Sequence, residues 1–279
     1  MINSQHKTTP GRVLIVAGSD SGGGAGIQAD IKTVTCLGAY AMTAVTAITV
    51  QNTQGVTNVH EVPVNIVSGQ IASVVSDIGV DVIKTGMLAS RLMIETVADA
   101  LERCAAGVPR IIDPVMRAKG GHALLAEDAA DALIRRLVKG AAVVTPNLPE
   151  AEVLTGRRIK TIGEMENAVE ACRALGAQAV LLKGGHLEGD RLLDLLITPN
   201  DVIRFEGTRL DTTSTHGTGC TLASAIAAGL AKGLPLSEAV IQARAYVRAA
   251  ILSAPGLGHG HGPLNHGHIF GAFGAALKS

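Results

Sequence analysis

The sequence predicts a three-layer α/β/α protein built on a mostly parallel central sheet. Short apolar runs alternate with stretches of helical spacing along almost the whole chain, as expected for a parallel sheet with helices on both faces. The strand-like runs are apolar throughout, which is typical of strands buried on both faces. Polar residues follow several of these runs, and in such sheets ligands bind outside the carboxyl ends of the strands.

The N-terminal part supplies the first elements of that sheet. Residues 12–17 are a buried apolar run, and the glycine turn after them leads into a helix expected at 25–37. Residues 40–50 are rich in Val, Ile and Thr, which is a strand pattern. Residues 64–78 space Val, Ile and Ala as an amphipathic helix does, so the chain begins as strand, helix, strand, helix.

The rest of the chain continues this alternation. Further buried strands are expected at 80–84, 110–113, 141–145 and 179–183, and a hairpin at 192–198 and 202–206. Helices are expected at 92–103, 128–138, 162–175, 219–232 and 236–253. Since no repeat or linker divides the chain, residues 12–279 are predicted to be one domain, preceded by a flexible segment at 1–11.

Composition limits the possible functions. Hydrophobic residues make up 47% of the 279 residues, so a large core can form. Lys plus Arg and Asp plus Glu are both 24, and the basic excess of a general nucleic-acid or membrane-surface binder is missing. The four cysteines form no Cys-x-x-Cys pair, and no apolar run approaches the roughly 20 residues of a membrane span. We therefore expect a cytoplasmic protein with a small-molecule partner, and no nucleic-acid or membrane partner.

The most informative segment is Gly217-Thr218-Gly219-Cys220, where a polar loop meets a helix of small residues. Backbone N–H groups at a helix start are unpaired and carry the positive end of the helix dipole. Glycines let an anion approach this backbone closely, so a phosphate is the expected guest. Cys220 lies in the first turn, where the dipole is expected to lower a thiol pKa, although a small structural Cys is the alternative.

Two common nucleotide-binding motifs are absent. The chain has no Gly-x-x-x-x-Gly-Lys-Ser/Thr sequence, which excludes a P-loop NTPase. The glycine-rich segment 22–26 does not fit Gly-x-Gly-x-x-Gly, because position 27 is Ile. This segment could equally be a flexible turn.

Several motifs instead occur in the order typical of one family. They are AGSDSGGGAGIQAD at 17–30, KTGML at 84–88, DPVM at 113–116, TPNLPEAE at 145–152, KGGH at 183–186, HGTGCT at 216–221 and GHGHGPLNH at 258–266. Over residues 12–268 the chain closely resembles the hydroxymethylpyrimidine/phosphomethylpyrimidine kinases of the ribokinase-like superfamily. The resemblance implies a ribokinase-like fold and ATP and Mg²⁺ as cofactors.

For the phosphoryl-transfer end of the site, the resemblance implies that Gly217 and Gly219 form an anion hole, with Thr218 beside the ATP phosphates. Cys220 occupies the place of the catalytic Asp of related sugar kinases, and a thiolate could take a proton from an alcohol. Asn147 and Glu150 match the superfamily's Asn-x-x-Glu motif, with Asn147 near ATP and Glu150 near Mg²⁺. Glu150 could alternatively be a helix-start carboxylate favoured by the dipole.

Two residues at predicted strand ends complete that end of the site. Asp113 precedes a proline, so its carboxylate should project from the sheet edge, and it is the second candidate metal ligand; a turn residue is the alternative. Lys183 leaves a strand toward two glycines and could neutralise ATP phosphates. A solvated strand end is the alternative for this lysine.

For the acceptor, the resemblance implies a pocket at the first-strand turn and the end of the second strand. Gln51 would hydrogen-bond the pyrimidine edge, because a side-chain amide matches a planar array of donors and acceptors. Met87 would provide a polarizable apolar wall. The other family-like pocket positions are Gly18, Asp30 and Val115.

The expected activity is ATP-dependent phosphorylation of 4-amino-5-hydroxymethyl-2-methylpyrimidine, and then of its monophosphate. A pyridoxal kinase of the same superfamily is the enzymatic alternative, and a non-catalytic ligand sensor is a second. By resemblance we also expect a homodimer. The tail holds His259, His261, His266 and His268, which could form a metal cluster, although a structural or lid role is favoured. Arg117 and Gly120 depart from the family pattern.

Overall fold

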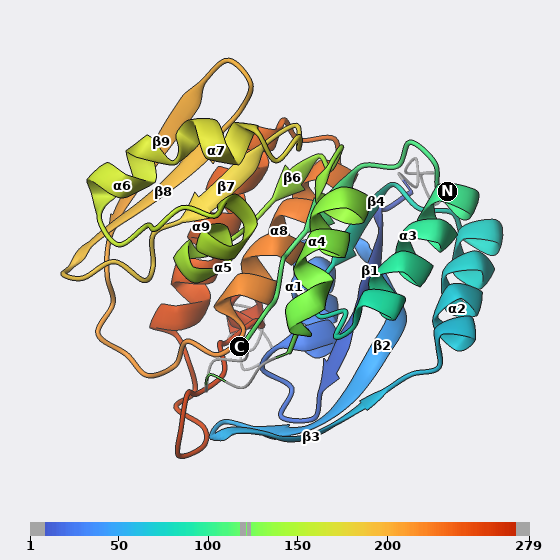
Figure 1. Cartoon of the computed structure of the whole chain (residues 1–279). Coiled ribbons are helices and arrows are strands. Elements are labelled where there is room, and N and C mark those ends of the chain that lie inside the picture. The colour runs from blue at the N-terminus through green and yellow to red at the C-terminus, as the bar shows by residue number, and fades with distance from the viewer. Residues whose placement is uncertain (1–8, 118–120, 122–123, 272–279) are drawn as a thin grey trace, which may run out of the picture.

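The computed structural model describes residues 9–117, 121 and 124–271. The strands in these residues are β1 (Arg12–Asp20), β2 (Tyr40–Asn52), β3 (Gly55–Glu61), β4 (Val82–Thr85), β5 (Arg110–Ile112), β6 (Val143–Val144), β7 (Val180–Lys183), β8 (Arg191–Ile197) and β9 (Val202–Thr208). They form one sheet in the order β3-β2-β1-β4-β5-β6-β7-β8-β9 (Figure 1). Most of the predicted flexible segment 1–11 lies outside the described residues. Gly120 also lies outside them.

Most of this sheet is parallel. β1 pairs in parallel with both β2 and β4, and parallel pairing continues through β5 and β6 to β7. The β2–β3, β7–β8 and β8–β9 pairs are antiparallel, so a hairpin or meander closes each end of the sheet. The carboxyl ends of the parallel strands therefore lie along one edge, where the sequence predicted the ligand site.

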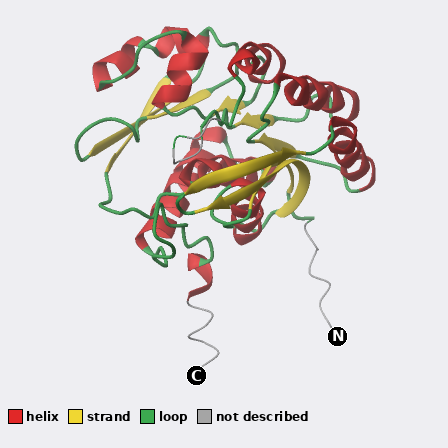
Figure 2. Ribbon diagram, turned by 60° about the horizontal axis from the view of Figure 1, so that its bottom comes forward, coloured by secondary structure: helices red, strands yellow, loops and turns green. Residues whose placement is uncertain are grey.

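Helices cover both faces of the sheet. They are α1 (Gly26–Cys36), α2 (Val64–Asp77), α3 (Arg91–Cys104), α4 (Ala130–Leu133), α5 (Leu148–Thr155), α6 (Ile162–Asn167), α7 (Val169–Arg173), α8 (Thr218–Ala231) and α9 (Leu236–Leu252). Figure 2 shows the sheet between two helical layers. None of the helices in the described part of the chain is both long and apolar enough to cross a membrane.

The two layers bury separate cores against opposite faces of the sheet. Successive residues of β1 alternate between them, with Leu14 and Val16 in one core and Val13 and Ile15 in the other. The first core lies under α2 to α7, and the second under α1, α8 and α9. This arrangement confirms the predicted three-layer fold with a mostly parallel sheet.

Four details differ from the sequence expectations. β3 was not predicted, because it is a largely polar edge strand without a continuous apolar run. The short helix α5 was not assigned as an element. The helix expected at 128–138 consists of a 3₁₀ turn at Glu127–Ala129, α4 and a π-helical turn at Ile134–Val138, and the helix expected at 162–175 is divided at Ala168.

Candidate active site

A cavity of about 1550 Å³ lies along the carboxyl edge of the sheet. Its walls come from the ends of β1, β2, β4 and β7, the loops after β5 and β6, and the starts of α5 and α8. This volume exceeds the roughly 300–1,000 Å³ typical of single small-molecule sites, so the cavity can accommodate two substrates together. All but one of the sequence-predicted site residues line it, namely Gly18, Gln51, Met87, Asp113, Val115, Asn147, Glu150, Lys183, Gly217, Thr218, Gly219 and Cys220.

The anion-binding turn begins α8. Gly217 precedes the helix with φ +83°, a left-handed conformation that favours glycine. The first helical hydrogen bond runs from Thr221 N to Gly217 O at 2.9 Å. Thr218 N already donates to Thr215 O at 3.4 Å, so the N–H groups of Gly219 and Cys220 are the first-turn donors that remain for an anion.

The structure corrects the expected ionisation of Cys220. Burial raises the pKa of its thiol to about 12, which outweighs the lowering effect of the Lys84 ammonium group. The carboxylates of Asp30 and Asp113 raise the pKa further. The helix dipole therefore does not produce a low-pKa thiol here, because two carboxylates and a desolvated site oppose it.

Lys84 and Asp30 form a fully buried ion pair, and the charges of both side chains act on Cys220. Lys84 Nζ contacts Asp30 Oδ1 and Oδ2 at 3.0 and 2.9 Å, and both side chains are completely inaccessible. Ser224 Oγ donates to Asp30 Oδ1 at 2.6 Å. Asp30 is thus the predicted pocket residue that does not line the cavity, whereas Lys84 does. The available signal for Lys84 was its position at the end of the predicted strand 80–84 and at the start of the KTGML motif.

The part of the cavity predicted to bind phosphate gathers the carboxylates of Asp113 and Glu150 and the lysine Lys183. Lys183 Nζ lies 3.5 Å from Asp113 Oδ1, and Thr145 Oγ1 donates to the same oxygen at 3.2 Å. Asp113 is buried, and its Oδ2 has no hydrogen-bond partner among the described residues. A Cβ atom on Gly219 would lie 3.5 Å from Lys183 Nζ and 3.9 Å from Asp113 Oδ2, so these groups face the anion-binding turn directly.

Glu150 is both a helix cap and a perturbed acid. Its Oε2 accepts from Asn147 N at 2.8 Å, and its own N–H donates to Asn147 Oδ1 at 3.0 Å, which forms a capping box at the start of α5. The capping alternative raised from the sequence is therefore present. Burial raises the pKa of Glu150 to about 7; Lys183 opposes this effect and Asp113 adds to it.

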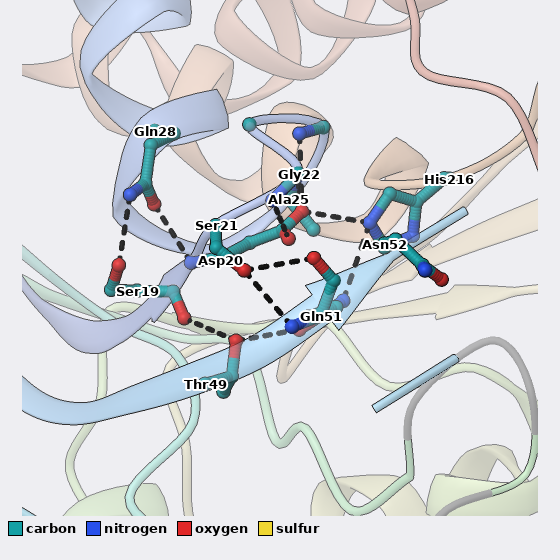
Figure 3. A network of polar contacts seen from close by, with 12 residues as sticks. Ser19, Asp20, Ser21, Gly22, Ala25, Gln28, Thr49, Gln51, Asn52 and His216 are labelled. Carbon is teal, nitrogen blue, oxygen red and sulfur yellow. Dashed lines mark hydrogen bonds and ion pairs between the residues drawn. The ribbon is translucent and has the colours of Figure 1, made fainter. Parts of the chain in front are cut away.

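The part of the cavity predicted to hold the acceptor includes Gly18, Met87 and Gln51. A Cβ atom on Gly18 would lie 3.1 Å from Met87 Sδ, and Thr46 Oγ1 fixes Met87 by donating to its carbonyl at 2.7 Å. Gln51 Oε1 lies 3.0 Å from Thr49 Oγ1, and Gln51 Nε2 lies 3.3 Å from His216 Nε2 (Figure 3). The Gln51 amide thus extends into a polar network.

Sequence reasoning did not assign roles to Asp20 and His216, which meet in that network. His216 Nε2 lies 2.8 Å from Asp20 Oδ2 (Figure 3). Burial raises the pKa of Asp20, but hydrogen bonds from His216, Ala25 and Gly22 outweigh that effect and leave it below the usual value. The available signal was their position, directly after the first strand and directly before Gly217.

Within the His-rich tail, His266 is packed in the interior, whereas His261 lines the cavity. Among the described residues, no three or more His, Cys, Asp or Glu side chains form a group that could hold a metal ion. His266 is buried with its Nε2 atom 2.9 Å from Thr221 Oγ1, and Tyr246 donates to its carbonyl at 2.6 Å. Burial, together with Lys32 and His268, lowers the pKa of His266 to about 4, so the ring is neutral near pH 7.

A mostly parallel α/β/α sheet, with an anion-binding helix start beside a lysine and two carboxylates, defines a phosphotransferase of the ribokinase-like class. A family model described as phosphomethylpyrimidine kinase matches residues 20–265. The chain belongs to the phosphomethylpyrimidine kinase family, as its motifs predicted.

Individual relatives agree with this assignment. A hydroxymethylpyrimidine/phosphomethylpyrimidine kinase of Rhizobium meliloti is 52% identical over 258 residues, which cover 91% of this chain and 96% of the relative. A Bacillus subtilis pyridoxal kinase, solved as an ADP complex, has a TM-score of 0.86 at 38% identity and covers 93% of this chain and 98% of its own. A phosphomethylpyrimidine kinase of Clostridium difficile has a TM-score of 0.76 at 40% identity, covering 86% and 99%.

Proposed function

We propose that this chain transfers the γ-phosphoryl group of ATP to the hydroxymethyl oxygen of 4-amino-5-hydroxymethyl-2-methylpyrimidine, and then to the phosphate of the product, in thiamine biosynthesis. The observation that supports the proposal is one cavity lined both by the residues predicted to bind the acceptor and by the lysine and carboxylates predicted to bind phosphate and metal. Relatives that are 44–52% identical are named hydroxymethylpyrimidine/phosphomethylpyrimidine kinases, and one is part of a thiamine biosynthesis bifunctional protein.

The chemistry requires positioning and charge neutralisation. In the first step the hydroxymethyl oxygen bonds to the γ-phosphorus, the bond from phosphorus to the ADP oxygen breaks, and the alcohol loses its proton. The N–H groups of Gly219 and Cys220 would receive the equatorial oxygens of the transferring group, and Lys183 would balance its charge. Related pyridoxal kinases were solved with ADP and with AMP-PCP, which supports ATP as the donor.

Asp113 and Glu150 fit a magnesium ion. A buried carboxylate oxygen without a partner is costly unless a cation or donor reaches it, and Asp113 Oδ2 is such an atom. Mg²⁺ commonly takes one or two protein carboxylates together with water and substrate phosphates, so the two groups would suffice. When bound, the ion would supply further neutralisation of phosphate charge.

Cys220 would act on the acceptor hydroxyl, either as a base or as a positioning group. A thiol with a pKa of about 12 is protonated near pH 7, so a base role requires substrate binding to change its surroundings. The alcohol must lose a proton, whereas the phosphate monoester is largely ionised near neutral pH. We infer that Cys220 matters more for the first phosphorylation than for the second.

Pyridoxal is the second candidate acceptor, because it is also a flat heteroaromatic ring with a hydroxymethyl group. The specific observation in its favour is the TM-score of 0.86 to the Bacillus subtilis pyridoxal kinase. The higher identity of 52% to a pyrimidine kinase favours the first candidate.

A side-by-side assay of ATP consumption tests the choice. We expect purified protein with MgCl₂ and ATP to phosphorylate the aminopyrimidine and its monophosphate with a higher kcat/KM than pyridoxal. A clear preference for pyridoxal would replace the first candidate by the second. No turnover with any of the three would leave a non-catalytic ligand sensor.

We also propose a cytoplasmic homodimer, on the basis of the family resemblance alone. Light scattering coupled to size-exclusion chromatography would give twice the 28.5 kDa chain mass. A mass of one chain over the working concentration range would reject the dimer.

A further inference from the structure

Two glycine-containing loops from opposite ends of the chain meet beside the acceptor pocket. One, called here the glycine loop, is residues 21–26 between β1 and α1; the other is the anion-binding turn 217–220. A Cβ atom on Gly217 would lie 1.9 Å from Gly24 O, and one on Gly24 would lie 2.6 Å from His216 Cδ2. The loops are therefore in direct contact, and a small shift of one must move the other.

Asp20 holds the glycine loop in its conformation. Its Oδ1 accepts from Gly22 N at 2.8 Å, and its Oδ2 accepts from Gly24 N at 3.1 Å and Ala25 N at 2.8 Å. The carboxylate is only 2% exposed, so these charge-assisted bonds are shielded from water. One side chain thereby accepts hydrogen bonds from three backbone N–H groups of the loop.

The same carboxylate reaches the anion-binding turn through His216. His216 Nε2 lies 2.8 Å from Asp20 Oδ2, although the two residues are 196 positions apart. Because Asp20 is ionised, the N–H form of Nε2 is the one that fits this contact. His216 N also donates to Gly262 O at 3.1 Å, so the residue before Gly217 is held from two sides.

The network also includes the predicted ring-recognition residue. Gln51 Nε2 lies 3.3 Å from the same His216 nitrogen, which is a contact and not a hydrogen bond when that nitrogen donates its proton to Asp20, and Ser21 Oγ donates to Gln51 O at 2.8 Å. Figure 3 shows the glycine loop and His216 at Asp20, with Gln51 of β2 beside Ser21 and His216. The predicted acceptor residue and the start of α8 are therefore linked by one chain of polar contacts, of which the His216–Asp20 contact is buried.

We propose that Asp20 and His216 form a positioning pair that holds the anion-binding turn at a fixed place relative to the acceptor pocket. The inference rests on the proposed function, since it concerns the alignment of the acceptor with the phosphoryl group. A misplacement of about 1 Å can cost about 100-fold in rate. Loss of the pair should accordingly lower kcat more than it weakens binding of either substrate.

Three variants test whether the Asp20–His216 contact itself supports the reaction. Asp20→Asn removes the charge but keeps an oxygen acceptor, His216→Leu removes the contact, and His216→Gln keeps an N–H donor at similar reach. Asp81→Asn is the matched control, because Asp81 also ties two segments by accepting from Arg12 N at 2.8 Å, but lies at the amino ends of the strands. Each variant is assayed with the aminopyrimidine and ATP, and its Tm is measured.

We expect kcat to fall about 100-fold in His216→Leu and about 10-fold in Asp20→Asn, with both KM values within threefold of wild type. His216→Gln should recover part of the loss, and Asp20→Asn should add little in the His216→Leu background, because contacting residues are not additive. Asp81→Asn should keep wild-type kcat.

Two results would overturn the pair. One is an Asp20→Asn enzyme with wild-type kcat, and the other is full additivity of the two substitutions, which would mean that His216 acts independently of Asp20. A wild-type protein that phosphorylates no pyrimidine would instead reject the proposed function, so the two failures are distinguishable. Pyridoxal as an alternative acceptor keeps the comparison of variants measurable in that case.

Discussion

Acidic side chains that line the same cavity differ in ionisation because their neighbours differ. Glu150 is buried beside Asp113 and has a pKa of about 7, whereas Asp20 accepts several hydrogen bonds and has a pKa below its usual value. Cys220 is a weak acid for the same reason as Glu150, since burial disfavours its charged form. Residue type alone therefore does not reveal which group carries charge before substrate binds.

The raised pKa of Glu150 predicts a dependence of stability on pH. Between its ordinary value of 4.5 and about 7, the folded protein binds more protons at this group than the unfolded chain does. The group's contribution is therefore complete below pH 4.5 and is lost as pH rises to about 7, by on the order of 3 kcal/mol. Glu150→Gln should lack this loss in urea unfolding measured from pH 4.5 to 8.

Glu164 provides the control for that experiment. It fills the same capping-box position at the start of α6, but it is exposed and its pKa is lowered, first by a hydrogen bond from the Lys160 backbone. Glu164→Gln should therefore keep the wild-type loss of stability from pH 4.5 to 7. If MgCl₂ and ATP leave the pH slope of the wild type unchanged, Glu150 does not meet the metal or the nucleotide.

Cys220→Ala tests the role of the thiol. We expect the first phosphorylation to fall by about 100-fold or more, because removal of a proton acceptor commonly costs 10²–10⁴-fold, and the second to fall less. The first rate is measured with the aminopyrimidine as substrate, and the second with its monophosphate. Cys172→Ala, which alters a buried thiol in α7, controls for the loss of a cysteine. Equal losses in both steps would favour positioning over proton transfer.

At the scale of elements, the start of α8 is the decisive feature. The small residues of α8, among them Ala223, Ala225 and Ala227, are fully buried and bring the helix close to the sheet. Its first turn faces Lys183 and Asp113 at the ends of β7 and β5. The element thus places unpaired N–H groups opposite a charged cluster that belongs to other elements.

Gly217→Ala tests the close approach at this helix start. Both Gly217 and Gly233, at the other end of α8, have φ near +83°, so alanine costs about 1–2 kcal/mol at either position. Only Gly217 has a backbone oxygen within 2 Å of an added Cβ, whereas Gly233 has nothing within 4 Å. In an activity assay, we expect Gly217→Ala to abolish activity and Gly233→Ala to keep it. Urea unfolding measures the cost in stability of each variant. Similar results for the two would show that φ strain alone matters.

At the scale of the whole molecule, the Lys84–Asp30 pair joins β4 to α1, and Ser224 extends the contact to α8. Breaking a buried pair by removing one partner leaves an unpaired charge and costs about 3–5 kcal/mol. Lys84→Met should therefore lower the free energy of urea unfolding by that amount, and Lys84→Met with Asp30→Asn should recover part of it.

The exposed pair Arg191–Glu206 supplies the control. Arg191→Met should cost less than about 1 kcal/mol, because both partners are more than half exposed and water screens them. If Lys84→Met lowers the free energy of unfolding no more than Arg191→Met does, the Asp30 carboxyl is neutral in the folded protein. That outcome would be consistent with the raised pKa that burial gives Asp30.

Much of the fold followed from local patterns, and its exceptions have physical causes. Continuous apolar runs identified the central strands, because a strand buried on both faces needs apolar residues at every position. β3 was missed because an edge strand needs few apolar residues, and its pairing with β2 is what defines it. The helix at 128–138 was expected as one element, but its C-terminal part is a π-helical turn.

The sequence determined the family, the sheet and the residues of the candidate site, because motifs and apolar periodicity are local properties. Only the tertiary structure decided which of those residues meet and in what ionisation state. It placed Asp30 against Lys84 beneath the cavity, gave Cys220 a raised pKa, and joined Asp20 to His216 across 196 positions. Burial and long-range contacts set pKa values and partners, and neither is written in a short motif.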